Sequence, residues 1–208
     1  MQLVTKTEVF NLAVLALGQT APIILADGDN TLTARILRQW YELALTKALA
    51  RTDWRCFRKT SSLTLMQDDF SPTWEFQYAI PSDAETILAV DFDNFFPAYD
   101  TLPARKLPFE IKYAGSTRSI VSNVPFAWAS YIVRPAPGVG FPAHFAEVLA
   151  LILAELAGPA LITNNWLRMK QGFLSDARER ISQSIAQDLG QQPERQNPKS
   201  SFADARRD

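Results

Sequence analysis

The sequence predicts an α+β protein: mainly a helical bundle of about four helices, with an inserted small antiparallel β domain and a disordered C-terminal tail. Three observations predict it. Two stretches with helical spacing of apolar residues open the chain and two more close it. Between them, apolar and polar residues alternate with period two, which is typical of half-buried strands. Residues 191–208 are almost without apolar side chains and cannot bury enough surface to fold alone.

Composition sets the broad class. The chain has 208 residues, of which 47% are hydrophobic and 11% aromatic, as in a globular protein of one or two domains. Acidic and basic residues number 22 and 21, so no overall field attracts the protein to nucleic acid or to an anionic membrane. Cys56 is the only cysteine, which excludes a disulfide framework and a Cys-rich metal site. We expect Cys56 to be a buried small hydrophobe, and the protein to be soluble, without signal peptide or membrane-spanning helix.

The first helix is short and has one apolar face. Thr5 or Thr7 can cap it, and Gly18 follows where a C-terminal cap is expected. After an apolar linker fixed by Pro22, a long helix runs from the polar cap at residues 29–31 to about residue 50. That helix carries two adjacent apolar stripes, which predict neighbours on both sides. The stripes are Leu32, Ile36, Trp40 and Leu43, and Leu37, Tyr41, Leu45 and Leu49.

The central region predicts five or six short antiparallel strands. Alternation is found at residues 63–65, 74–80, 87–92, 109–113, 119–122 and 128–133. Residues 94–110 are rich in proline and aromatic residues and predict a loop or an excursion at a sheet edge, since proline is excluded from central strands.

Helix resumes after the Pro-Gly segment at residues 135–140. Residues 144–157 are apolar nearly all round, which predicts a helix buried in a bundle or an oligomer. Gly158 and Pro159 should break or kink it, and a last amphipathic helix follows over residues 166–189. The predicted domains are therefore residues 1–56 with 141–190 as the bundle, 57–140 as the β insertion, and 191–208 as the tail.

Candidate catalytic and metal-binding residues are few. His144 is the only histidine; it can pair with Glu147 one turn later, or it is a structural residue at the start of the helix. An acidic set could bind a hard cation, although it lacks a calcium-loop pattern and is more typical of a solvated loop. It consists of Asp68, Asp69, Asp91, Asp93 and Asp100. Gly138 and Gly140 lack the rest of a dinucleotide-binding motif. We expect no catalytic residue, no metal and no cofactor.

One basic-aromatic cluster leaves a nucleic-acid-binding module as the alternative function. Arg51, Arg55, Arg58 and Lys59 interleave with Trp54 and Phe57, an arrangement that can track a phosphate backbone. The same arginines can instead pair with neighbouring carboxylates at the exit of the long helix. The near-neutral net charge favours the second interpretation.

Three blocks of sequence, in order, resemble the phage head-to-tail adaptor proteins of the tail tubular protein A type. The first begins with Leu17 and Gly18 and ends with residues 52–57, Thr-Asp-Trp-Arg-Cys-Phe. It is similar to the family's short helix ending in "LG" and its long helix ending near a "W-x-F"-like motif. The second, residues 76–83, is similar to the family's "Y-x-LP-x-D" strand end. The third, residues 141–157, is similar to its "P-x-x-F-x-E-A-L … LA-x-x-LA" helix. The resemblance spans most of residues 8–165 and departs from the family pattern at residues 94–110 and after Gly190.

This resemblance implies a structural virion protein at the head-tail junction, made in the host cytoplasm. Such a protein forms a homo-oligomeric ring, usually of twelve copies, beneath the portal protein. It extends the channel for double-stranded DNA without sequence-specific binding, and it attaches the tail nozzle or other tail proteins. Position in the chain then suggests two sets of contact residues. The expected portal contacts are Arg195, Lys199, Phe202, Arg206 and Arg207, and the expected subunit or tail contacts are Leu37, Tyr41, Phe95, Phe96 and Tyr99.

Overall fold

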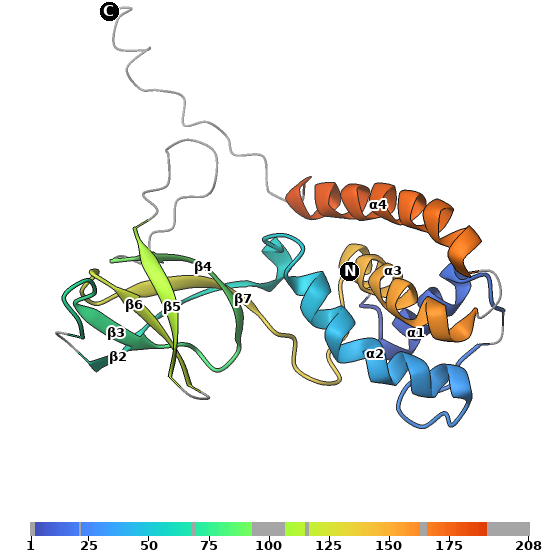
Figure 1. The fold of residues 1–208 in the computed structure, drawn as a ribbon, viewed down its shortest axis with the longest axis horizontal. Coiled ribbons are helices and arrows are strands. Elements are labelled where there is room, and N and C mark those ends of the chain that lie inside the picture. The colour runs from blue at the N-terminus through green and yellow to red at the C-terminus, as the bar shows by residue number, and fades with distance from the viewer. Residues whose placement is uncertain are drawn as a thin grey trace, which may run out of the picture.

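The computed structural model describes residues 3–20, 22–67, 70–92, 107–114, 117–162 and 166–190. Within these ranges the chain forms four α-helices, one short 3₁₀ helix and seven β-strands. Helices and strands lie in two halves side by side, and the strands make up one whole half of the molecule (Figure 1). The expectation of a mainly helical bundle with a small β insertion is therefore wrong. The expected disordered tail, residues 191–208, lies outside the described residues.

The first two helices begin at side-chain caps. Helix α1, Lys6–Ala16, starts at Thr5, whose hydroxyl accepts from the amide of Glu8 while the Glu8 carboxylate accepts from the amide of Thr5. It ends at Ala16, and a positive φ of 73° at Gly18, two residues later, lets the chain turn away. Helix α2, Leu32–Leu49, starts at Thr31, whose hydroxyl accepts from the amide of Ala34.

Helix α3, Ala143–Leu161, is the centre of the helical half, because α1, α2 and α4 all pack against it. Twelve of its residues are buried, which explains its nearly continuous apolar sequence. By length and composition α3 could also cross a membrane, but 67% of its apolar window is buried inside the molecule. The sequence predicted a break or a kink at Gly158 and Pro159, and the helix does not break there. Pro159 lies in the last turn of α3, so few residues follow it before the helix ends.

Helix α4, Trp166–Gly190, lies along the outer side of α3 (Figure 1). The ring of Trp166 in α4 packs directly against Gly158 of α3, where no side chain is in the way. A Cβ atom at Gly158 would lie 2.5 Å from the Trp166 ring, which is closer than two carbon atoms can approach.

The strands form two antiparallel sheets. The three-stranded sheet has the order β1-β7-β4, and the four-stranded sheet has the order β2-β3-β6-β5. Their bounds are β1 Arg58–Ser62, β2 Thr64–Gln67, β3 Phe76–Ala79, β4 Ala84–Asp91, β5 Phe109–Ala114, β6 Thr117–Ser122 and β7 Trp128–Val133. Strand β1 is the one that the sequence missed. Its residues, Arg-Lys-Thr-Ser-Ser, carry no apolar alternation because this edge strand is largely exposed.

Two apolar cores meet at strand β7. Tyr131 belongs to the core between the strands, whereas its neighbour Ile132 belongs to the core of the helical half. Alternate side chains of a strand point to opposite faces, so β7 contributes to the helical core on one face and to the core between the strands on the other. This strand therefore joins the two halves. Arg134, directly after β7, adds ion pairs to Glu42 of α2 and Glu85 of β4.

Candidate interaction site

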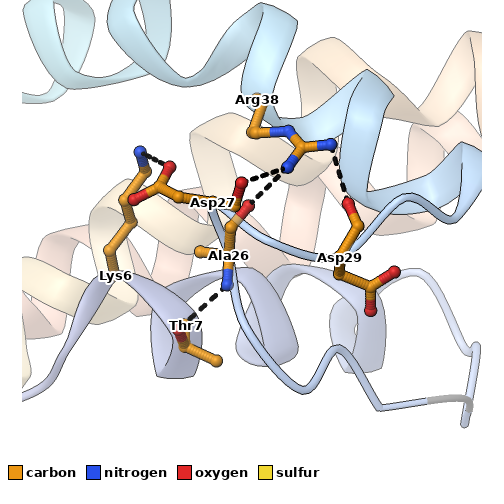
Figure 2. Close-up of polar contacts among 6 residues, drawn as sticks. All are labelled: Lys6, Thr7, Ala26, Asp27, Asp29 and Arg38. Carbon is orange, nitrogen blue, oxygen red and sulfur yellow. Dashed lines mark hydrogen bonds and ion pairs between the residues drawn. The ribbon is translucent and has the colours of Figure 1, made fainter.

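The segment that connects α1 to α2 is held by side chains of both helices. From α2, the guanidinium of Arg38 donates hydrogen bonds to three backbone carbonyl oxygens (Figure 2). The distances are 3.3 Å to Ala26, 2.9 Å to Asp27 and 2.7 Å to Asp29. Because the guanidinium is planar and rigid, these bonds fix the backbone of the connection relative to α2.

Helix α1 holds the same segment from the other side. The Thr7 hydroxyl accepts from the amide of Ala26 at 3.1 Å, and Lys6 pairs with Asp27 at 2.6 Å (Figure 2). One turn further along, the amide side chain of Asn11 bonds to both backbone groups of Ile23. It accepts from the Ile23 amide at 2.7 Å and donates to the Ile23 carbonyl at 3.1 Å. A segment with this many backbone bonds is ordered without being regular secondary structure.

This braced segment presents two aliphatic side chains to solvent, which we call the apolar tip: Ile24 and Leu25. They are 87% and 58% exposed, while the flanking Ile23 and Ala26 are 4% and 2% exposed. Ile23 and Ala26 anchor the segment in the core of the helical half. The apolar tip therefore stands on a rigid base, which makes it a candidate surface for a protein contact.

A groove lies between α1, α3 and α4, with a volume of about 510 Å³. Its apolar lining includes Leu12, Leu15, Ala150, Leu151 and Phe173, and charged groups line it as well. Leu12 and Leu15 are 40% and 60% exposed. We call this the α1/α3/α4 groove. The sequence analysis missed both the apolar tip and the groove. The tip was interpreted as a linker, and a groove between helices has no local sequence signal.

The expected contact residues on α2 are not on the surface. Leu37 is fully buried and Tyr41 is 7% exposed, and both belong to the core of the helical half. Burial raises the pKa of Tyr41 to about 12, and the nearby carboxylate of Glu42 adds to the shift. Their stripe faces neighbouring helices of the same chain, so their assignment as subunit contacts is corrected. Phe95, Phe96 and Tyr99 lie outside the described residues, as do the proposed portal contacts Arg195, Lys199, Phe202, Arg206 and Arg207.

The basic-aromatic cluster is partly engaged in ion pairs. Lys59 pairs with Asp83 at 2.7 Å, and Arg58 lies 3.6 Å from Asp53. Arg51 is exposed, whereas Arg55 is partly buried. Trp54 is fully buried and donates from Nε1 to the carbonyl oxygen of Ala48, so it is not available to stack on a base.

His144 is paired, but with a residue that the sequence analysis did not single out. Its Nε2 lies 3.1 Å from Oδ1 of Asp188 in α4, and both side chains are 2% exposed. Glu147 instead accepts a hydrogen bond from Ser184 at 3.2 Å. Local spacing favoured Glu147 because it is one turn away, whereas Asp188 is 44 residues distant.

Gly138, considered above as part of a dinucleotide-binding motif, lies in a turn and has a positive φ of 82°.

Of the five acidic residues proposed as a possible cation site, only Asp91 lies within the described residues. Asp91 lies at the end of β4 and its carboxylate accepts from the amide of Phe92. Asp68, Asp69, Asp93 and Asp100 lie outside the described residues. Comparison with protein-family models and with curated proteins gives no match for this chain.

Proposed function

We propose that this chain is a head-to-tail adaptor subunit of a phage virion, a non-enzymatic protein that forms a ring beneath the portal. Two lines of reasoning support the proposal. The first is the resemblance of three ordered sequence blocks to the tail tubular protein A type. The second is the presence of two unlike apolar surfaces on the helical half: the projecting tip and the α1/α3/α4 groove, which have no residue in common.

The pair of surfaces is the observation that carries the proposal. A ring is built by a heterologous contact, in which one surface of each subunit meets a different surface of the next. A rigid aliphatic projection and an apolar groove are suited to such a contact, since burying them together removes apolar area from water on both partners. In this proposal the apolar tip of one subunit enters the α1/α3/α4 groove of its neighbour.

The charge of the chain agrees with a DNA conduit. With 22 acidic and 21 basic residues, the subunit lacks the excess of basic groups that holds DNA through many phosphate contacts. Double-stranded DNA can then pass through the ring without being retained. The portal protein above and the tail nozzle or other tail proteins below are the proposed partners.

The test is assembly of the purified chain, alone and mixed with its portal, measured by light scattering and electron microscopy. We expect Ile24→Asp to abolish the ring, because it places a charge on the apolar tip. Its melting temperature should stay close to that of the wild type, since the replaced side chain is 87% exposed. The matched control is Leu43→Asp on α2, where an aliphatic side chain is 42% exposed but belongs to neither proposed surface. Rings that form equally well with Ile24→Asp would contradict the proposed contact.

The same samples distinguish the adaptor from the alternative function, a nucleic-acid-binding module. DNA binding that weakens with salt and disappears when Arg51, Arg55, Arg58 and Lys59 are neutralised would favour a nucleic-acid-binding module. If that protein also stayed monomeric in the presence of the portal, the adaptor proposal would be wrong.

A further inference from the structure

Three side chains of different chemistry meet where the 3₁₀ helix η1, Arg55–Phe57, lies between the ends of α3 and α4. They are Cys56 of η1, His144 in the first turn of α3 and Asp188 near the end of α4. The Cys56 sulfur, a ring nitrogen of His144 and a carboxylate oxygen of Asp188 all lie within 4.8 Å of one another. These atoms come from three segments that are far apart in the sequence, so no spacing motif marks them.

The site is closed on two sides and open on the third. The side chains of His144 and Asp188 are both 2% exposed, whereas Cys56 is an exposed residue. The expectation that Cys56 is a buried hydrophobe is therefore corrected. Solvent reaches the cluster from the cysteine side, where a water molecule can act as a fourth ligand. Three protein ligands and one water make a tetrahedral set.

The groups around the ligands hold them in position. The Asp188 Oδ2 atom accepts from the backbone amide of Arg55 at 2.7 Å, which leaves Oδ1 directed at His144. The ring of buried Trp54 lies beside the His144 ring, with 6.1 Å between centroids. Outer contacts of this kind orient the ligands of metal sites.

The ligand set selects one class of ion. Sulfur, imidazole nitrogen and carboxylate oxygen together suit Zn²⁺, whereas Mg²⁺ and Ca²⁺ prefer oxygen ligands alone. A cysteine thiolate and a carboxylate balance the two positive charges of the ion, so the occupied site is electrically neutral next to the buried core. Nitrogen and oxygen ligands about 2.0–2.1 Å from zinc in a tetrahedron lie about 3.4 Å apart. The observed separation of 3.1 Å is close to this distance.

We propose that Cys56, His144 and Asp188 bind one Zn²⁺ ion, which joins η1 to the start of α3 and the end of α4. Binding releases the thiol proton of Cys56 to solvent as the sulfur–zinc bond forms. Because the thiol must lose its proton to bind zinc, the apparent affinity for zinc should rise with pH. This inference is independent of the adaptor proposal.

The experiment titrates the full, untagged chain with Co²⁺ and follows the thiolate-to-cobalt absorption band, then displaces cobalt with Zn²⁺. We expect one ion per chain, and a melting temperature that rises when zinc is added. Cys56→Ser should remove the absorption band and weaken binding by about a hundredfold. It should fold normally because Cys56 is exposed. Asp176→Asn is the matched control, since it removes an exposed carboxylate from the same helix.

The outcomes separate a zinc site from a hydrogen-bonded cluster. If the absorption band is absent from the wild type, or Cys56→Ser binds cobalt as tightly as the wild type, the proposal is overturned. In that case Asp188 serves only as a buried acceptor for its neighbours. A loss of binding in Cys56→Ser together with unchanged binding in Asp176→Asn supports the proposal.

Discussion

The side chain of Asp83 binds residues of two strands in the three-stranded sheet, β1 and β7. Its carboxylate pairs with Lys59 of β1 and accepts a hydrogen bond from the Tyr131 hydroxyl of β7 at 3.1 Å. The bond from Lys59 is the main cause that lowers the pKa of Asp83 below its ordinary value, and the bond from Tyr131 adds to it. The same pair raises the pKa of Lys59 above its ordinary value.

These shifts predict a pH window for the pair. A lowered carboxyl pKa stabilises the folded state above the ordinary value near 4, and this is lost as pH falls through the folded pKa. A raised lysine pKa stabilises below the ordinary value near 10.4, and this is lost as pH rises through the folded pKa. The pair should thus contribute between about pH 4 and 10. The contribution is small because both side chains are partly exposed.

The measurement compares urea unfolding of the wild type and Asp83→Asn at pH 7 and pH 3. We expect the variant to be less stable at pH 7 and the difference to shrink at pH 3. Asp27→Asn is a useful comparison, since it breaks an exposed ion pair in the other half of the molecule. An Asp83→Asn difference that is as large at pH 3 as at pH 7 would contradict the assigned ion pair.

Between elements, Gly158 decides how closely α3 and α4 approach. In an exposed helix interior, replacing glycine with alanine should stabilise by up to about 1 kcal/mol. At Gly158 the added methyl group would meet the fixed ring of Trp166, which is itself 7% exposed and packs 5.6 Å from the Phe173 ring. We expect this steric conflict to outweigh helix propensity, because the Trp166 ring is buried and packs against Phe173.

We therefore predict that Gly158→Ala destabilises the protein by about 1–3 kcal/mol, the usual range for overpacking. The matched control is Gly172→Ala in α4, where a new Cβ atom meets nothing within 4 Å. That change should leave stability unchanged or raise it by up to about 1 kcal/mol. Calorimetry of the two variants provides the comparison. Equal effects at both glycines would show that the α3–α4 contact is looser than described.

At the scale of the whole molecule, the helical core is built from residues between Val9 and Ile181. Helix α4, on the outer side of α3, is the last described element and ends at Gly190 (Figure 1). Residues 191–208 lie outside the described residues. In the adaptor proposal this segment reaches the portal through Arg195, Lys199, Phe202, Arg206 and Arg207.

Truncation after Gly190 tests that assignment. We expect the shortened chain to keep the melting temperature of the wild type and to lose binding to the portal, measured by co-sedimentation. Ring formation through the apolar tip and groove should persist where the wild type forms rings alone. Normal portal docking by the truncated chain would show that the tail has another role, without affecting the ring contact.

Local patterns determined much of this protein from the sequence alone. The four helical stretches and most strands were predicted, because a period of 3.6 or 2 and a capping hydroxyl act over a few residues. Strand β1 was not predicted, since its polar residues become a strand only by pairing with β7. The β region, predicted as a small insertion, instead contains two sheets of three and four strands.

Only the tertiary structure decided which surfaces and clusters exist. Whether Tyr41 faces its own bundle or another subunit depends on α3 and α1, which no pattern within α2 records. His144 meets Asp188 and Cys56 through the packing of α4 and η1 against α3, across long separations in the chain. Contacts of this kind arise from the joint burial of many side chains, so they follow from the folded arrangement and not from any local stretch.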